Sequence, residues 1–282
     1  YFPIVPQHWK LTWLKNRIFT EKKDTEDLGI YLNIIKEFRP DIIHIHGTEN
    51  PFGSLIGRTN IPIVVSVQGN INVCHHKYFS GLEKKLLFKN YMFYESIYNF
   101  PFYQSFKKDH LRFSFMAERE RRNLKKCRYI IGRTSWDRRI TRILAPESVY
   151  FHCDEILRDV FYNKTWRPPR KTGKIIIHTT NGNSPFKGFE TVCQVINLLN
   201  DAGVDFEWRV AGIRETDLIV KLVKRMLGEK YPSKCLVLLG NLGEYELAER
   251  LLEANMYVMP SHIENSPNNL CEAMMLGMPC IA

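Results

Sequence analysis

Two carboxylates lie close to an expected helix start near the end of this 282-residue sequence. Glu264 lies in a polar loop after the apolar run 256–259, and Glu272 lies inside the helix that comes next. The N–H groups of a helix's first turn lack partners within the helix and form a positive end that binds phosphate. Here those groups belong to Asn268, Asn269 and Leu270. Because carboxylates accept hydrogen bonds from hydroxyl groups, the pattern fits a diphosphate flanked by two sugars, which describes a nucleotide-sugar.

Capping residues set the expected limits of this helix. Ser266 suits the N-cap, Pro267 the first helical position, and Gly277 the position just after the last turn. Glu272 lies five residues after Pro267, which is roughly 7 Å along the axis at about 1.5 Å per residue. The apolar run 256–259 before the loop is typical of a buried strand. The sequence therefore predicts a strand, a loop with one carboxylate, and a helix with the other.

The full segment is PSHIENSPNNLCEAMMLGMPCIA, in which seven residues separate Glu264 from Glu272. It resembles the signature of retaining glycosyltransferases of family 4, the glycosyl transferases group 1, which have the GT-B fold. The resemblance implies that Glu264 contacts the transferred sugar and Glu272 the ribose of the nucleotide. The structural alternative is a capped surface helix with an incidental Glu. A zinc site like that of nucleobase deaminases is disfavoured, because their His-x-Glu lies on a helix and His262 precedes Glu264 in a loop.

Length and composition limit the class of protein. A length of 282 residues favours two domains, and a hydrophobic share of 44% is typical of a globular protein. No apolar run approaches the roughly 20 residues that span a bilayer. Seven Cys without a Cys-x-x-Cys pair favour the reducing cytoplasm, with peripheral contact to the inner face of the membrane as an open alternative. The sequence begins without Met and stops inside an expected strand, so we expect a fragment that lacks both termini of a longer enzyme.

Apolar strands alternate with helical spacers along the sequence. The strands expected in the first half are 41–47, 61–69, 127–137 and 148–153. After a linker at 163–174, which contains Pro and Gly, further strands are KIIIHTT, DFEWRVAG, CLVLLGNLG and MYVMPS. Such alternation predicts parallel sheets with helices on both faces. We therefore expect an α/β protein with two doubly wound Rossmann-like domains, 1–165 and 166–282. The family resemblance implies the GT-B arrangement, in which these domains face a central cleft.

The segment from about 74 to 126 is basic, aromatic and expected to be mostly helical. Residues 77–142 contain 17 Lys and Arg against 6 Asp and Glu, so this region carries the net charge of +10. Residues 78–115 contain 13 aromatic residues of the 17 Phe, 13 Tyr and 5 Trp in the chain. Three interpretations stay open: contact with anionic lipid headgroups, contact with nucleic acid, or an insert whose rings pack on the sheet. We expect no nucleic-acid partner, because no nucleic-acid-binding motif is recognisable.

Ligands of open α/β sheets bind beyond the carboxyl ends of the strands, and several polar residues fall there. We expect His46, Gly69 and Arg133 on the acceptor side of the cleft, with strand-end packing and an interdomain ion pair as structural alternatives. In the resembled family, the strand that here ends at Gln68 often ends in a His near the reacting centre. Gln68 can bind a sugar hydroxyl but is neither acid nor base near neutral pH. The resemblance therefore implies catalysis without a protein base at this position.

Two further turns in the second half are expected to contact the nucleotide. Lys187 and Gly188 resemble the family's Lys-Gly pair, in which the Lys neutralises the diphosphate as a point charge. The Arg that the family usually has five or six residues earlier is missing, since Asn181 and Gly182 occupy those positions. A Gly turn after a later strand favours close backbone approach to the base, with simple turn geometry as the alternative. The residues of that turn are Gly240, Asn241 and Leu242.

Together with these residues, the family resemblance implies a hexosyltransferase that moves a sugar from a UDP- or GDP-sugar to a saccharide or lipid-linked acceptor with retention. The catalytic residues are expected to be Glu264, Lys187 and Gln68. The metal-binding Asp-x-Asp motif of the other main glycosyltransferase fold does not occur, so we expect neither a metal nor a cofactor. Cell-surface polysaccharide or glycolipid synthesis is the expected process. The alternatives are a sugar-nucleotide epimerase on the same fold and a non-catalytic basic module at a membrane surface.

Overall fold

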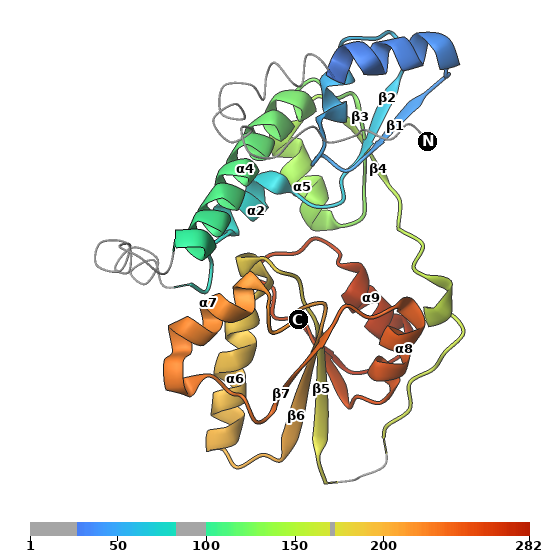
Figure 1. The fold of residues 1–282 in the computed structure, drawn as a ribbon. Coiled ribbons are helices and arrows are strands. Elements are labelled where there is room, and N and C mark those ends of the chain that lie inside the picture. Colours follow the sequence, from blue (N-terminus) through green and yellow to red (C-terminus); the bar gives the residue numbers. More distant parts are fainter. Residues whose placement is uncertain (1–26, 83–99, 170–172) are drawn as a thin grey trace. The chain divides into compact units, whose positions relative to one another are not determined.

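The computed structural model describes residues 27–82, 100–169 and 173–282 (Figure 1). It divides the chain into two compact units. Unit 1 combines the residues up to Gln68 with Glu118–Cys153, and unit 2 combines Gly69–Ala117 with Asp154–Ala282. The middle of the predicted basic insert, residues 83–99, lies outside the described residues. Among the helices within the described ranges, none combines the length and the apolar character needed to cross a membrane.

Unit 1 is built on a parallel sheet of four strands, in the order β1, β2, β3, β4. The strands are β1 (Ile43–His46), β2 (Ile63–Ser66), β3 (Tyr129–Gly132) and β4 (Val149–His152). Ile45, Val65 and Ile130 are buried in one core because they share a face of the sheet. A short 3-10 helix, η1 (Pro51–Leu55), and helix α5 (Ser135–Leu144) connect the strands. All four strands lie within the segments that the sequence predicts.

Unit 2 is built on a parallel sheet of five strands, in the order β7, β6, β5, β8, β9. The strands are β5 (Ile175–Thr180), β6 (Phe206–Ala211), β7 (Leu236–Gly240), β8 (Met256–Val258) and β9 (Cys280–Ile281). The helices between them are α6 (Phe189–Asp201), α7 (Leu218–Leu227), α8 (Glu244–Leu252) and α9 (Asn268–Met275). Each crossover passes through a helix to another parallel strand, and three of the four lead to the adjacent strand. The crossover through α8 instead leads from β7 to β8, on the far side of β5.

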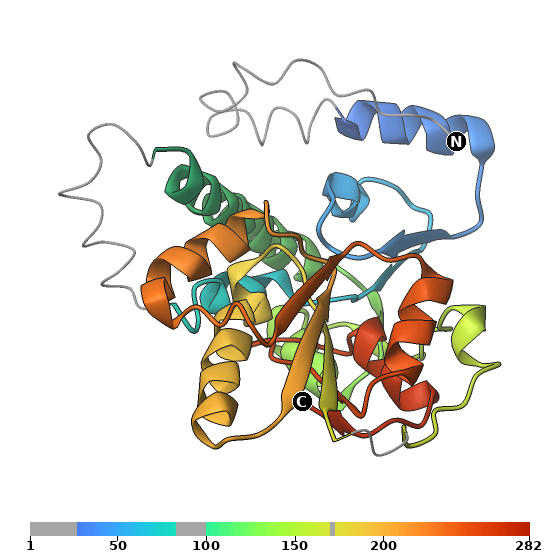
Figure 2. The same ribbon diagram turned by 60° about the horizontal axis from the view of Figure 1, so that its bottom comes forward.

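The helices of unit 2 cover both faces of its sheet. Figures 1 and 2 show α6 and α7 on one face and α8 and α9 on the other. Phe189 of α6 and Val220 of α7 pack in one buried cluster, whereas Leu251 of α8 and Leu276 of α9 pack in another. This arrangement confirms the predicted Rossmann-like α/β architecture. Whether the two units face a central cleft stays a prediction.

The described part of the basic insert divides between the units: its residues up to Ala117 group with unit 2 and those from Glu118 with unit 1, whereas the sequence assigned the whole insert to domain 1–165. The part in unit 2 contains α2 (Ile71–Lys77) and the start of α4 (Phe100–Leu124). Phe106 is buried in the same cluster as Phe189, and burying such a ring stabilises a fold by about 2 kcal/mol. The far end of α4 carries Leu124, which is buried in the core of unit 1. The two ends of one helix therefore pack in two different cores, which the sequence pattern did not reveal.

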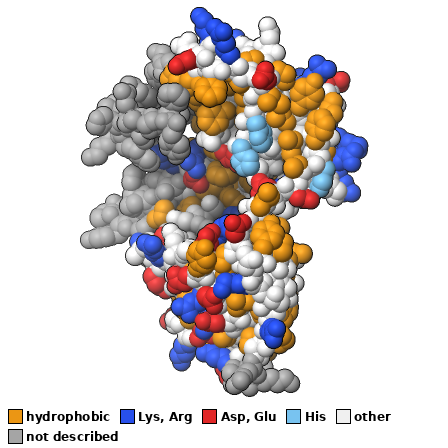
Figure 3. All heavy atoms as spheres, turned by 90° about the vertical axis from the view of Figure 1, so that its right-hand side faces the viewer, with side chains coloured by type: hydrophobic (Ala, Val, Ile, Leu, Met, Phe, Trp, Pro, Cys, Tyr) orange, Lys and Arg blue, Asp and Glu red, His pale blue; other side chains and the backbone are white. Residues whose placement is uncertain are grey.

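Exposed side chains differ in type between the units. On the face drawn in Figure 3, hydrophobic and His side chains gather on unit 1, whereas charged side chains are interspersed over unit 2. The exposed hydrophobic residues of unit 1 include Val149 and Phe151 of the edge strand β4, together with Phe38 and Ile42. Aromatic rings of the insert, in contrast, face inward, since Tyr78 and Phe106 are buried. For these residues the packing interpretation of the insert fits better than a lipid-facing one.

Candidate active site

The loop after β8 brings two of the predicted catalytic residues together. β8 pairs with β5 in parallel, so the segments after both strands leave the sheet at the same edge. Glu264 from the loop after β8 accepts a hydrogen bond from Lys187 Nζ, which lies at the end of a short 3-10 helix, η3 (Pro185–Lys187). Lys187 Nζ also lies 5.5 Å from the centre of the Phe186 ring. A cation and a carboxylate thus meet at the carboxyl edge of the sheet, where an anionic ligand can compete for the cation.

Gly188 permits the close packing that holds this pair. It is the N-cap of α6 and has a left-handed φ of 74°, which favours glycine. A Cβ atom at this position would lie 2.0 Å from the Pro260 carbonyl oxygen, at the end of the β8 segment. In addition, the His262 N–H donates to the Phe186 carbonyl oxygen at 2.9 Å. The turn with Lys187 and the loop with Glu264 are therefore joined through their backbones.

Helix α9 begins one residue later than predicted. Pro267 occupies the N-cap position in place of Ser266, and the helix runs from Asn268 to Met275. The Leu270 N–H donates to the Pro267 carbonyl oxygen at 3.1 Å and to Asn269 Oδ1 at 3.0 Å, so a phosphate would compete with these two acceptors. The predicted phosphate contact of Leu270 stays a prediction. The Asn269 amide donates to the Thr180 carbonyl oxygen at 3.0 Å and ties the helix start to β5. Phosphate binding by the backbone of Asn268 and Asn269 stays a prediction.

Glu272 is held by an arginine that the sequence did not identify as its partner. Arg158 donates from Nε to Glu272 Oε1 and from Nη2 to Glu272 Oε2, both at 2.7 Å. The Glu272 side chain is 3% exposed, against 41% for Arg158. The hydrogen bonds from Arg158 to this carboxylate raise the pKa of Arg158 above its usual value. The fork fixes Glu272 in place, while its role at a ribose stays a prediction.

The ends of β6 and β7 form a tightly packed corner. The Gly212 N–H donates to the Gly240 carbonyl oxygen at 2.6 Å, and both glycines have positive φ. A Cβ at Gly212 would lie 2.2 Å from the Asn181 carbonyl oxygen. A Cβ at Gly240 would lie 3.3 Å from both Cγ and Nε of Arg214, an exposed residue. Arg214 thus lies over the predicted base-binding turn, and the sequence did not single it out.

The other two residues of that predicted turn differ in burial. Asn241 is exposed, whereas Leu242 packs against the buried cluster of α8 and α9. The Leu242 side chain therefore stabilises the fold, while a contact of its backbone with the base stays a prediction. One more strand residue, His178 of β5, is fully buried, and burial lowers its pKa to about 3. His178 is consequently a neutral core residue.

In unit 1, three of the predicted residues meet at the carboxyl ends of β1, β2 and β3. The Gln68 amide lies 3.4 Å from His46 Nδ1. Arg133 Nη2 donates to the backbone oxygen of Gln68 at 3.0 Å and to its Oε1 at 3.3 Å. On the same face, His44 Nε2 lies 2.6 Å from Ser66 Oγ. Gly69, the fourth predicted residue, follows Gln68 directly but belongs to unit 2.

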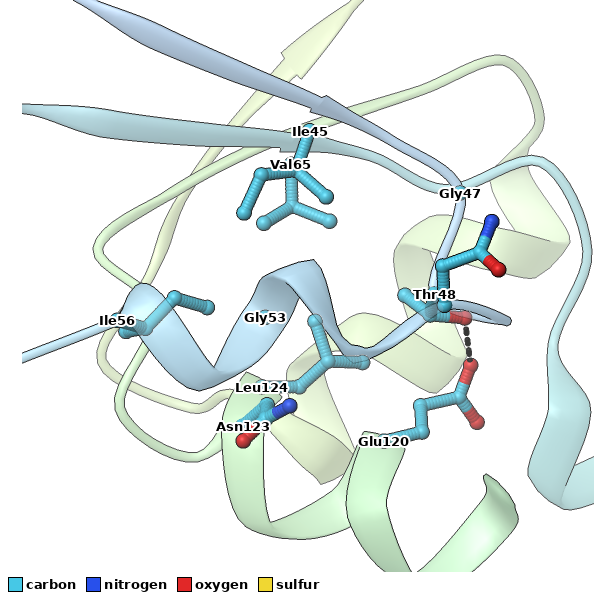
Figure 4. Close-up of a pocket in the computed structure, with 10 residues that line it drawn as sticks. Ile45, Gly47, Thr48, Gly53, Ile56, Val65, Glu120, Asn123 and Leu124 are labelled. Carbon is cyan, nitrogen blue, oxygen red and sulfur yellow. Dashed lines mark hydrogen bonds between the residues drawn. The ribbon is translucent and has the colours of Figure 1, made fainter. Parts of the chain in front are cut away.

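A pocket in unit 1 contains a buried carboxylate that the sequence did not identify. Thr48, just after β1, donates from Oγ1 to Glu120 Oε1 at 2.5 Å, and Glu120 is 1% exposed (Figure 4). Asn123 lines the pocket beside Gly53, where a Cβ would lie 2.6 Å from Asn123 Nδ2. The apolar part of the lining comes from Ile45, Ile56, Val65 and Leu124. Among the residues that the structure describes, no cluster of His, Cys, Asp and Glu could hold a metal ion.

We compared the chain with known protein families, sequences and structures. Residues 173–282 match the family model described as glycosyl transferases group 1. No curated protein sequence matches the chain. Sucrose-phosphate synthase from Thermosynechococcus elongatus is similar in structure, with a TM-score of 0.61 and 13% identity over 92% of this chain and 60% of that chain.

Two similar structures contain bound ligands. Anabaena HepE in complex with UDP and glucose has a TM-score of 0.56 and 11% identity, over 88% of this chain and 61% of that chain. A mutant of S. aureus TarM, in complex with fondaparinux, α-GlcNAc-glycerol and UDP, has a TM-score of 0.57 and 12% identity, over 90% of this chain and 44% of that chain. At these identities the similarity shows the fold, which is GT-B. The chain thus combines the GT-B fold with a segment, 173–282, that matches the family model of glycosyl transferases group 1.

Proposed function

We propose that the chain is part of a glycosyltransferase that moves a sugar from a UDP- or GDP-sugar to a saccharide or lipid-linked acceptor. The chain spans 60% of the similar sucrose-phosphate synthase, so the activity proposed is that of the whole enzyme. The observation that carries the proposal is the pairing of Lys187 with Glu264 at the carboxyl edge of β5 and β8 in a group 1 domain. A cation and a carboxylate in contact suit a ligand that carries phosphate and hydroxyl groups together.

Donor binding begins with an exchange of partners. The diphosphate of the donor attracts Lys187 more strongly than the Glu264 carboxylate does, because the diphosphate carries more charge and more acceptor oxygens. Once Lys187 binds the diphosphate, Glu264 is free to accept hydrogen bonds from hydroxyl groups of the sugar. The first N–H groups of α9, from Asn268 and Asn269, add positive potential beside the phosphates.

The nucleoside occupies the other polar positions of unit 2. Glu272, fixed by Arg158, accepts hydrogen bonds from the ribose hydroxyls with the lone pairs that the arginine leaves open. The base approaches the backbone of Gly240 and Asn241. Arg214, which lies over Gly240, supplies a cation for the nucleotide in place of the family's missing Arg.

Transfer then proceeds with retention and without a metal. The bond between the sugar's anomeric carbon and the phosphate oxygen breaks, and the diphosphate leaves with the electron pair. Lys187 stabilises the charge on the leaving group, and Glu264 favours the positive charge that develops on the sugar. The acceptor oxygen attacks from the side of the leaving group and forms the new bond. Its proton passes to a phosphate oxygen, so no general base of the protein is required.

Unit 1 carries the acceptor side in this proposal. The side chains of His46 and Gln68, with Arg133 beside them, offer donors and acceptors suited to neutral hydroxyl groups. Binding of UDP with glucose to HepE, and of UDP with α-GlcNAc-glycerol to TarM, supports a UDP-sugar donor and a saccharide acceptor. Exposed Lys108 and Arg112 on α4 favour a lipid-linked acceptor in polysaccharide or glycolipid synthesis at the inner face of the membrane.

Thermal-shift screening of the full-length enzyme against UDP-, GDP- and ADP-sugars tests this proposal. A ligand that binds only the folded state raises the melting temperature, so we expect one nucleotide class to do so strongly. Subsequent incubation with the selected donor and a panel of acceptors should yield a glycosylated product rather than an altered donor sugar. Conversion of the donor sugar without transfer would identify an epimerase, and no shift with any of the nucleotides would refute donor binding.

A further inference from the structure

A second pair of ionisable residues lies next to the proposed donor site and has no part in the mechanism above. His262, two residues before Glu264, places Nε2 2.5 Å from Glu190 Oε1. Glu190 belongs to the first turn of α6 and its side chain is 0% exposed. Its second oxygen, Oε2, is buried and has no hydrogen-bond partner among the described residues. A buried carboxylate with an unsatisfied oxygen is costly, so this position calls for a functional reason.

The pair fixes the loop that carries Glu264. The imidazole of His262 anchors the loop to α6 through Glu190, and the His262 N–H anchors it to Phe186 at 2.9 Å. Phe186 directly precedes Lys187. Consequently, a displacement of His262 would move Glu264 relative to Lys187, the two groups on which transfer depends in the proposed function.

The basic insert contacts both anchors of this loop. Gly81, which follows α2, has a φ of +79°, and a Cβ there would lie 1.9 Å from Glu190 Oε1 and 2.3 Å from His262 Nε2. The ring centroid of Tyr78, which is fully buried, lies 6.0 Å from that of Phe186. Tyr78 is itself held by a hydrogen bond of 2.6 Å from its hydroxyl to Asp109 of α4. The backbone of the insert thus packs directly on the pair.

We propose that the insert positions the donor-sugar loop. Gly81 packs on Glu190 and His262, and this pair sets the place of Glu264 beside the sugar. The consequence for catalysis rests on the proposed function. The contact of Gly81 with Glu190 and His262 does not. Gly81, Glu190 and His262 are positioning residues, which act on the donor through Glu264. The insert then has a role in the donor site, in addition to any contact that its basic surface makes.

The substitution Gly81→Ala in the full-length enzyme tests the proposal, with Gly203→Ala as the matched control. Gly203 lies in the same unit and has a φ of +71°, but nothing lies within 4 Å of the Cβ that alanine would add. Both variants therefore impose similar backbone strain, and only Gly81→Ala strikes the pair. Hydrogen exchange in peptides that cover 256–266 should become at least tenfold faster in Gly81→Ala and stay within twofold of wild type in the control.

The ratio of two affinities separates positioning from a general structural effect. We expect Gly81→Ala to weaken binding of UDP-glucose, or of GDP-mannose for a GDP-specific enzyme, at least tenfold more than binding of the free nucleoside diphosphate. A general loss of structure would weaken both equally. His262→Ala adds no atom and should produce the same selective loss, so it carries the test should Gly81→Ala not fold.

A background that lacks both side chains of the pair tests whether the loss in Gly81→Ala arises from contact with that pair. In the Glu190→Ala/His262→Ala background the atoms that the new Cβ strikes are gone, so Gly81→Ala should cost no more than Gly203→Ala costs in wild type. Equal effects of Gly81→Ala with and without the pair would overturn the proposal, as would exchange rates equal to those of the control. A wild-type enzyme that binds none of these nucleotides would refute the proposed function, while the exchange data would still test the positioning.

Discussion

The carboxyl ends of the strands carry different chemistry in the two units. In unit 2 they carry the charged pair of Lys187 with Glu264, and a second charged pair, Arg158 with Glu272, holds the helix that follows β8. In unit 1 the corresponding positions carry the neutral amide of Gln68 beside an imidazole, with Arg133 bonded to that amide. Charged pairs can exchange partners with an anionic ligand, whereas amide and imidazole groups suit neutral hydroxyl groups. The difference is consistent with the proposed donor side in unit 2 and the proposed acceptor side in unit 1.

An added Cβ would meet different kinds of atoms at two glycines of unit 2 and at two glycines of unit 1. In unit 2, a Cβ added at Gly188 or Gly212 would strike a backbone carbonyl, at 2.0 Å and 2.2 Å respectively. In unit 1, a Cβ at Gly47 or Gly53 would strike the side chain of Glu49 or Asn123. Side chains can move aside at small cost, but a carbonyl in a packed turn cannot. The turns at Gly188 and Gly212 therefore tolerate fewer residue types than those at Gly47 and Gly53.

The largest effect is expected at Glu264. Glu264→Gln keeps the size of the side chain but removes the charge that favours the cationic sugar, so transfer should fall by about 10²- to 10³-fold. Binding of the nucleoside diphosphate should remain, because Lys187 then has no competing partner. Steady-state rates with a matched donor and acceptor measure the loss. A variant of the full-length enzyme that transfers at the wild-type rate would remove Glu264 from its role.

The next largest effect concerns the ion pair of Arg158 with the buried Glu272. Arg158→Ala leaves a carboxylate that is 3% exposed without its partner, and such a loss costs about 3 kcal/mol. Urea unfolding measures the free energy of unfolding. Lys164→Ala is the control, because its partner Glu249 is 59% exposed and an exposed pair contributes about 0.5 kcal/mol. Equal losses in the two variants would show that burial of Glu272 does not matter.

A smaller effect is expected on the acceptor side. Gln68→Ala removes the side-chain amide that contacts His46 and accepts from Arg133, and a typical hydrogen bond contributes about 1 kcal/mol. The KM for the acceptor should therefore rise by roughly fivefold, because about 1 kcal/mol corresponds to that factor. The affinity for the donor should not change. A selective loss of donor affinity would instead place Gln68 beside the donor and break the contrast between the units.

The sequence predicted the strands and the turn at Lys187 and Gly188 well, because apolar runs and Gly positions are local signals. It failed where partners are distant along the chain. Arg158 and Glu272 are 114 residues apart, and His262 and Glu190 are 72 apart. The membership of Phe106 in the core of unit 2 likewise depends on tertiary packing. Local pattern therefore located the candidate residues, while the fold alone determined which of them meet.

Isothermal titration of the nucleoside diphosphate selected by screening, into wild type and Lys187→Ala, tests the central claim most directly. Lys164→Ala is the matched control, since its side chain is 29% exposed, against 30% for Lys187, and also pairs with a Glu. Loss of one charge contact to phosphate, about 2 kcal/mol, should weaken binding by roughly thirtyfold in Lys187→Ala. The control should bind as wild type does. Equal affinity of wild type and Lys187→Ala would contradict the claim that this lysine binds the donor's diphosphate.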